Sequence, residues 1–224
     1  ATITMVQSKA AMDALNAVAD LIDLQKYAGE TVRAVGWRPY QTLESVLEAA
    51  TMTADIQALL TAERIVSLGA TGADYTVNAA GWTVLGNAGA NTLIGGAGNA
   101  TIYGGDGNDT ITLAYQSDNS IVEGGAGNDR IQGGVGADTY LFNRGDGQDT
   151  IIESWSDGGV TDKIVFGAGI AASDLTATRS GNDLVIKIND PDNPLVTDEI
   201  TIKNWNYSGY RIEQVQFADG AAWT

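Results

Sequence analysis

A unit of nine residues repeats along the middle of the chain and limits the possible folds more than any other feature. Its clearest copy, GGDGNDTIT, occupies residues 104–112. Other copies begin at residues 86, 95, 124, 133 and 144, an irregular copy covers 114–122, and a weaker one covers 157–165. The eighth place is apolar, namely Leu93, Ile102, Ile111, Ile121, Ile131, Tyr140, Ile151 and Ile164. The sixth place is Asn91, Ala100, Asp109, Asn119, Asp129, Asp138, Asp149 and Asp162. Such a period predicts a solenoid in which each repeat stacks on others.

Each unit suits a glycine-rich turn of about six residues followed by a strand of about three. The glycines permit the positive φ angles of a sharp turn that exposes its carbonyl groups. In so short a strand only the central residue points inward, which explains one apolar residue per unit. Two units form one coil, so sixth-place aspartates in alternate units should face each other, as Asp109 faces Asp129 and Asp129 faces Asp149.

Facing carboxylates repel each other, and the turns direct carbonyl oxygens at the same region. A hard divalent cation with oxygen ligands relieves both effects, and calcium accepts six to eight oxygens in adaptable geometry. The chain has no His and no Cys, which removes the usual zinc ligands, disulfides, thiolate nucleophiles and Ser-His pairs. We therefore expect calcium as the cofactor and no enzyme activity in this chain.

The charge of the chain points the same way. Of the net charge of −16, half lies in residues 81–157, which carry ten acidic and two basic residues. Such a field favours cations and repels nucleic acids and anionic membranes. We expect no nucleic-acid partner and no membrane span, and no secretory signal peptide is visible. The chain begins at Ala1 and ends in FADGAAWT, so we expect a piece of a longer chain.

The pattern G-G-x-G-x-D-x-U-x resembles that of the RTX (repeats-in-toxin) family of haemolysin-type calcium-binding proteins. The resemblance covers residues 86–165 and extends to the C-terminus, where DTYLFNRGDGQDTIIES, SGNDLVIKI and ITIKNW are similar to the segment that caps such repeats. It implies a mainly β fold, a calcium-loaded parallel β-roll with an N-terminal helical segment and a C-terminal antiparallel β cap. The expected boundaries are 1–71 for the helical segment, 72–165 for the roll and 166–224 for the cap. The EF-hand and dinucleotide-loop patterns do not fit these turns.

The resemblance also implies ligand sets, in which turn carbonyls combine with sixth-place carboxylates two units apart. The first site would use Gly105, Gly107, Asp109, Gly124, Ala126 and Asp129. The second would use Gly125, Gly127, Asp129, Arg144 by its carbonyl, Asp146 and Asp149. The third, on the opposite edge, would use Gly134, Gly136, Asp138, Asp157, Gly159 and Asp162. A weaker site would use Asn87, Gly89, Asn91, Gly104 and Asp106, and Ala100 removes a ligand from another. We expect about three good sites.

The flanks carry weaker signals. Residues 8–29, 42–50 and 53–69 read as helices, which either pack together or cover the open end of the roll, or form a partner-binding module. Residues 72–86 read as a strand pair that leads into the first coil. Short alternating runs after residue 160 predict the antiparallel cap, with Leu184, Ile186 and Ile188 on one face and Val185 and Lys187 on the other.

The leading hypothesis is a non-catalytic calcium-binding module of a larger secreted protein. The resemblance implies a Gram-negative bacterium, type I secretion and folding on calcium outside the cell, with the fragment a monomer. One alternative is an adhesion module that binds a surface glycan or protein, and another is the tail of a secreted enzyme or toxin. An ice-binding surface is not favoured, because the third places carry no threonine row.

Overall fold

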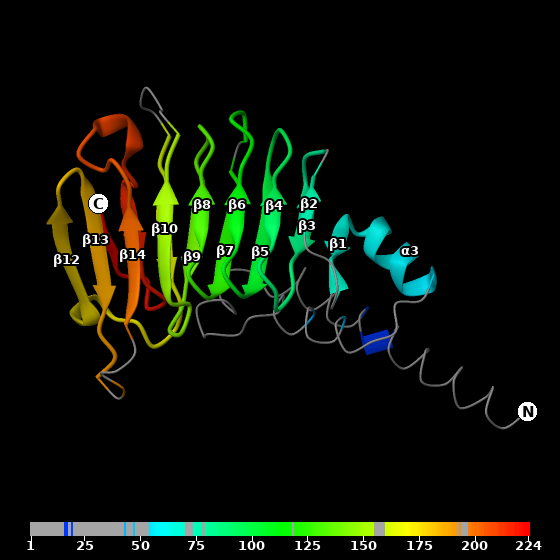
Figure 1. The fold of residues 1–224 in the computed structure, drawn as a ribbon, viewed down its shortest axis with the longest axis horizontal. Helices are drawn as coiled ribbons and strands as arrows, with labels where there is room; N and C mark the ends of the chain where they lie inside the picture. Colours follow the sequence, from blue (N-terminus) through cyan, green and yellow to red (C-terminus); the bar gives the residue numbers. More distant parts are fainter. Residues whose placement is uncertain are drawn as a thin grey trace, which may run out of the picture.

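The computed structural model describes residues 54–69, 74–77, 79–117, 119–154, 160–191, 193 and 197–224, with five isolated positions at 16, 17, 19, 43 and 47. Two eight-stranded sheets dominate this part of the chain. Figure 1 shows their strands side by side along the long axis of the molecule, with the short helix α3 (Ala54–Ala62) at one end. None of the described helices is long and apolar enough to cross a lipid bilayer.

Sheet A and sheet B are wound alternately, as expected for a parallel β-roll. Sheet A has the order β1 (Ile65–Ser67), β3 (Trp82–Leu85), β5 (Ala100–Asp106), β7 (Ile121–Ala126), β9 (Thr139–Phe142), β11 (Lys163–Phe166), β15 (Gln214–Gln216) and β16 (Ala222–Trp223). Sheet B has the order β12 (Leu175–Ser180), β13 (Asp183–Ile188), β14 (Asp198–Ile202), β10 (Gln148–Ile152), β8 (Arg130–Gln132), β6 (Thr110–Thr112), β4 (Thr92–Ile94) and β2 (Asp74–Thr76). The predicted mainly β fold, with its parallel roll, is confirmed.

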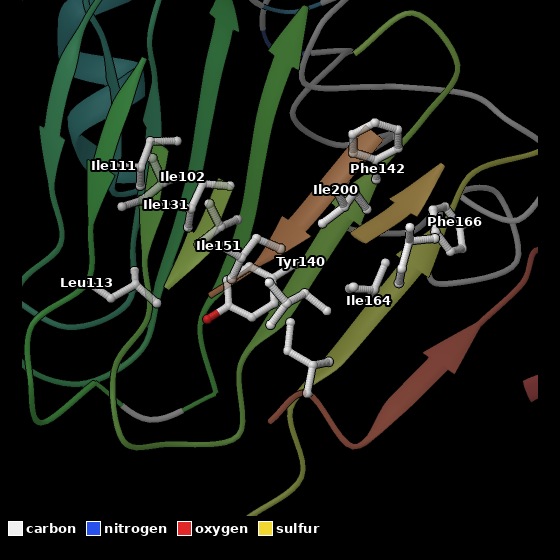
Figure 2. Close-up of a cluster of buried hydrophobic side chains, with 14 of the residues drawn as sticks. Ile102, Ile111, Leu113, Ile131, Tyr140, Phe142, Ile151, Ile164, Phe166 and Ile200 are labelled. Atoms are coloured by element: carbon white, nitrogen blue, oxygen red, sulfur yellow. The ribbon is translucent and has the colours of Figure 1, made fainter. Parts of the chain in front are cut away.

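The eighth-place residues fill the space between the sheets. Side chains of the row Leu93, Ile111, Ile131 and Ile151 from sheet B meet those of sheet A in one continuous core. Figure 2 shows this cluster, in which Tyr140 takes the place that isoleucine holds in most other units. Each of these side chains is at most 2% exposed, because a three-residue strand directs only its middle residue inward.

The prediction for the irregular unit at 114–122 is wrong by one residue. Val122 pairs with Ile102 and is fully buried, whereas Ile121 is half-buried and pairs with Thr101. Ser120, rather than Asn119, therefore occupies the place of the aspartates. Val122 follows its partner Ile102 by 20 residues, where two regular units would give 18, and Asn119 in this turn has a φ of 53°.

The N-terminal flank also differs from its prediction. The helix expected over 53–69 ends at Ala62, and strand β1 follows and pairs in parallel with β3. The strands expected over 72–86 are present as β2 and β3, but they lie in opposite sheets instead of pairing with each other. A second apolar cluster packs on the outer face of sheet A, formed by Leu43, Leu47, Ile56, Leu60, Ile65, Leu85 and Tyr103. Predicted helices 8–29 and 42–50 lie almost entirely outside the described residues.

The C-terminal cap continues both sheets of the roll. β14 pairs in parallel with β10, and β15 pairs in parallel with β11. The predicted antiparallel pairing occurs between β12 and β13, between β13 and β14, and between β15 and β16. As predicted, Ile186 and Ile188 are buried while Lys187 is exposed. Two short 3₁₀ helices, η2 (Ala172–Asp174) and η3 (Ser208–Tyr210), lie in the connections.

Candidate metal centres at the two turn edges

Two rows of turns flank the roll, and both carry buried acids. The turns that lead from sheet A strands to sheet B strands form the A-to-B edge, and those that lead from B to A form the B-to-A edge. Asp109, Asp129 and Asp149 lie on the first, while Asp138 and Asp162 lie on the second. These five side chains are between 0 and 4% exposed. Buried carboxylates require compensation by hydrogen bonds or by a cation.

On the A-to-B edge, each aspartate accepts a hydrogen bond from the backbone of the unit one coil earlier. The N–H of Asn91 donates to Asp109 Oδ1 at 2.7 Å, and that of Asp109 donates to Asp129 Oδ1 at 2.7 Å. The Asp129 N–H donates to Asp149 Oδ1 at 3.0 Å. The facing arrangement expected from the repeat spacing is therefore present, with separations of 18 or 20 residues.

A second ladder runs along the B-to-A edge. The Ser120 N–H donates to Asp138 Oδ1 at 2.9 Å, and the Asp138 N–H donates to Asp162 Oδ1 at 2.8 Å. The ladder ends in the cap, where the Asp162 N–H donates to Glu213 Oε2 at 2.9 Å. Glu213 directly precedes β15, so it takes the place that an aspartate holds in the repeats.

These bonds occupy only one oxygen of the carboxylates at the centre of the A-to-B edge. Asp109 Oδ2 and Asp129 Oδ2 are buried and have no hydrogen-bond partner. An unpaired carboxylate oxygen in the interior is strongly unfavourable unless a cation binds it. Among the described residues, no three acidic side chains converge closely enough to hold a metal by themselves. A cation here would therefore need backbone carbonyls as well, which are the ligands that calcium accepts.

The glycines leave the space that such an ion would need. A Cβ on Gly104 would collide with Asp109 Oδ2 and the Gly124 carbonyl, and a Cβ on Gly124 would collide with Asp129 Oδ2. A Cβ on Gly125 would collide with the Gly105 carbonyl. Carbonyl and carboxylate oxygens thus crowd the same narrow region between neighbouring turns, and the residues present fit calcium.

The carboxylates are poorly stabilised in the absence of a cation. Burial raises the pKa of Asp109 to about 6 and that of Asp129 to about 7, although the backbone N–H donors act in the opposite direction. Burial, followed by repulsion from Asp129, raises the pKa of Asp149 to about 9. Burial also raises the pKa of Asp162 to about 7. A bound cation favours the ionised form, so metal binding releases protons from these groups.

The two sets expected around Asp129 are brought together in space. Gly105 pairs with Gly125, Asp106 pairs with Ala126, and Gly127 forms a bridge with Gly147. The carbonyls of Ala126 and Asp146, both expected as ligands, accept hydrogen bonds from Gly107 N–H at 2.7 Å and Gly127 N–H at 2.9 Å. A carbonyl oxygen has a second lone pair, so these bonds leave it able to bind a cation.

Asp146 and Arg144 use their side chains differently. The Asp146 carboxylate is 1% exposed and accepts from the Asn143 N–H at 2.7 Å. The Arg144 guanidinium reaches the cap, where it donates to the Asp174 carboxylate at 2.6 Å and to the Gly169 and Asn189 carbonyls, both at 3.0 Å. The last turn of this edge is thereby tied to the cap.

The remaining expected ligands fall into two groups. In the weaker set, Asn87 and Asn91 bond to each other. The Asn87 N–H donates to Asn91 Oδ1 at 3.0 Å, and the Asn91 side-chain amide donates to Asn87 Oδ1 at 3.2 Å. The Gly89 N–H also donates to Asn87 Oδ1, at 2.9 Å. Amide groups therefore supply the bonds that carboxylates and a cation would supply elsewhere. In the third set, the Gly134 N–H donates to Asp138 Oδ2 at 3.1 Å, and Gly136 is buried nearby. Asp157 and Gly159 lie outside the described residues.

Three acids that take part in the turn edges were missed in the sequence. Asp198 Oδ2 and Oδ1 accept from the Gly145 N–H at 2.8 Å and the Gly147 N–H at 3.2 Å, and Glu213 ends the other ladder. Glu153 follows β10 and is only 2% exposed. The first two lie far from the repeats in sequence, so only the folded cap reveals them. Glu153 could have been noticed as an acid at a place where other units have glycine.

The stacked turns, the inward apolar row and the two carboxylate ladders define a parallel β-roll of calcium-binding nonapeptide repeats. The family model for the RTX calcium-binding nonapeptide repeat (4 copies) matches residues 83–113 and 116–151. The model for the haemolysin-type calcium binding protein related domain matches residues 183–224. This chain therefore carries an RTX, haemolysin-type calcium-binding repeat block with its C-terminal cap.

A curated relative matches part of this chain. The chain is 42% identical over 82 residues to the "Iron-regulated protein FrpA" of Neisseria meningitidis serogroup C. The aligned part is 37% of this chain and 7% of that protein. The chain therefore spans only a small fraction of the length of this relative.

Proposed function

We propose that this chain is a non-catalytic module that folds when calcium binds between neighbouring turns of the roll. The buried, unpaired oxygens Asp109 Oδ2 and Asp129 Oδ2 carry this proposal, because each lies against a glycine turn that leaves room for an ion. We assign the good sites to the three ligand sets around Asp129 and Asp138, and the weaker one to the turn of Asn91.

The mechanism is coupled folding and binding. Without a cation, the acidic and glycine-rich middle cannot offset its chain entropy and the repulsion between stacked carboxylates. A ligand that binds only the folded form adds RT ln(1 + [Ca]/Kd) of stability per site. Extracellular calcium modules have Kd values of roughly 10⁻⁴–10⁻³ M, so such sites remain empty at the calcium concentration of the cytosol.

RTX repeat proteins are typically secreted by Gram-negative bacteria, and the relative described above comes from one. We propose that this module belongs to a longer protein that leaves the cell by type I secretion. The chain would cross the envelope unfolded and fold outside, where calcium is abundant. Adhesion to a glycan or protein, an enzyme or toxin elsewhere in the longer protein, and a monomeric state stay predictions.

Two measurements test the proposal. In calcium, far-UV circular dichroism should show the strand signal of the roll, and a chelator should abolish it reversibly. Calorimetric titration of the calcium-free chain should show binding coupled to a large folding enthalpy, with about three ions bound. The same spectrum in calcium and in excess chelator would refute coupled folding.

A further inference from the structure

Glu153 lies inside the roll at a corner where the nonapeptide pattern has no acid. The Leu113 N–H donates to the Gln132 carbonyl, and the Gly133 N–H donates to the Ile152 carbonyl, both at 2.8 Å. In each pair the acceptor is the last strand residue of the next coil. These bonds stack Leu113, Gly133 and Glu153 in one row along the B-to-A edge. Leu113 is buried in the core, and Glu153 continues the same inward row.

The carboxylate of Glu153 is incompletely satisfied. The residue is 2% exposed, and its Oε1 is buried without a hydrogen-bond partner. The Oε2 atom accepts one long bond, from the Ser154 N–H at 3.3 Å. Burying a carboxylate in this way is strongly unfavourable unless a further ligand is present.

Tyr140 brings its hydroxyl to the same corner. Its side chain is 1% exposed, and its hydroxyl acts on the Glu153 carboxylate as a hydrogen-bond donor although the two groups do not reach full hydrogen-bond geometry. A Cβ on Gly133 would collide with both the Tyr140 hydroxyl and Glu153 Oε2, so the two groups share the space beside this glycine. Figure 2 shows the Tyr140 ring within the isoleucine cluster with its hydroxyl oxygen at one end.

The nearby charges that act on Glu153 are also carboxylates. Asp162 has the largest electrostatic effect on it and Asp138 a smaller one. Both carboxylate oxygens of Asp138 already accept hydrogen bonds from backbone N–H groups. Within the described part of the chain, only Oδ1 of the Asp162 carboxylate accepts such a bond. Asp162 is therefore the better partner for a shared cation.

The repeat spacing is broken at this point. Asp138 and Asp162 are 24 residues apart, whereas the other facing residues of the two ladders within the repeats are 18 or 20 apart. The regular pattern is therefore interrupted between these two aspartates. Glu153 places a side-chain oxygen beside Gly133 at this interruption, because its backbone stacks on that glycine.

We propose that Glu153 is a calcium ligand outside the nonapeptide pattern, which shares an ion with Asp162 on the B-to-A edge and is oriented by the Tyr140 hydroxyl. This assignment rests on the proposed calcium-dependent folding of the module. Calcium suits the position because it binds carboxylates together with carbonyl and hydroxyl oxygens.

The test counts the ions bound on folding. The free energy of unfolding is measured by urea denaturation at several calcium concentrations. Its slope against ln[Ca], divided by RT, gives the number of calcium ions taken up on folding. Glu153→Gln keeps the size of the side chain and one acceptor oxygen, and its slope should be lower than that of the wild type by one ion. Tyr140→Phe should keep the slope but need more calcium for folding. Glu199→Gln, on the outer face of the cap, removes the same charge and should match the wild type.

Each result decides the question. An unchanged slope for Glu153→Gln, or the same loss of stability in Glu153→Gln and Tyr140→Phe at every calcium concentration, would make the pair a structural hydrogen bond and overturn the assignment. Failure of Glu153→Gln to fold at any calcium concentration would overturn it as well. A wild-type slope of zero would instead reject the proposed function itself.

Discussion

Asp129→Asn is the sharpest test of the A-to-B edge. Asp129 Oδ1 accepts the Asp109 N–H at 2.7 Å, while its Oδ2 is buried without a partner beside Gly124. Asparagine keeps the acceptor oxygen for the backbone bond but removes the charge from the centre of the edge. In the proposed ligand sets this carboxylate serves two ions, one toward Asp109 and one toward Asp149, so both sites should weaken together.

The expected loss follows from linkage. At 10 mM calcium and Kd values of roughly 10⁻⁴–10⁻³ M, each filled site adds about 1.4–2.7 kcal/mol, so losing two sites costs about 3–5 kcal/mol. Without calcium the effect should reverse, because the substitution removes a buried carboxylate that the fold stabilises poorly.

The assay is urea unfolding, followed by circular dichroism, at 10 mM calcium and at lower calcium concentrations that still fold the wild type, with the strand signal alone compared in calcium-free buffer. Asp106→Asn is the matched control, since it changes the same charge on a neighbouring turn at an exposed side chain and should have little effect. Equal losses in the two variants would show that general charge, and not a shared site, determines stability. A loss at Asp129 that is independent of calcium would likewise refute the reasoning.

Two further predictions concern protons and glycine. In calcium-free buffer, the raised pKa values of Asp109 (about 6) and Asp129 (about 7) stabilise the folded form fully below pH of about 4, and this stabilisation is lost as pH rises through about 6–7. Circular dichroism of calcium-depleted protein should therefore show more strand at pH 4 than at pH 8, and the opposite trend would contradict these pKa values. Gly125→Ala should abolish calcium-induced folding, because φ is +100° and the new Cβ would collide with the Gly105 carbonyl. Gly145→Ala, at φ +87° with open space around it, should lower the free energy of unfolding by only about 1–2 kcal/mol. Equal losses in Gly125→Ala and Gly145→Ala would show that the close approach of Gly125 to the Gly105 carbonyl has no role in folding.

The period of nine was sufficient to predict coils of two units that stack on one another, and the resemblance to the RTX family added the parallel β-roll. A short turn and a short strand leave one inward residue per unit, so Ile111 and Ile131 could be placed in the core from their spacing alone. The same period placed Asp109 and Asp129 one coil apart, as their hydrogen bond confirms. Wherever the repeat is regular, the spacing of its glycines, aspartates and apolar residues determines the turn, the facing carboxylate and the inward side chain of each unit.

The tertiary structure decided what happens where the repeat fails. The two extra residues between Ile102 and Val122 moved Val122 into the core, which spacing could not show. Glu213 completes a ladder that begins some 90 residues earlier, at Ser120, and its role depends on β15 pairing in parallel with β11. Glu153 gains its position from Gly133, whose missing side chain makes room for it. The sequence by itself thus determined the coil and its acidic edges, while packing between distant segments decided which acids end the ladders and which lies buried beside Tyr140.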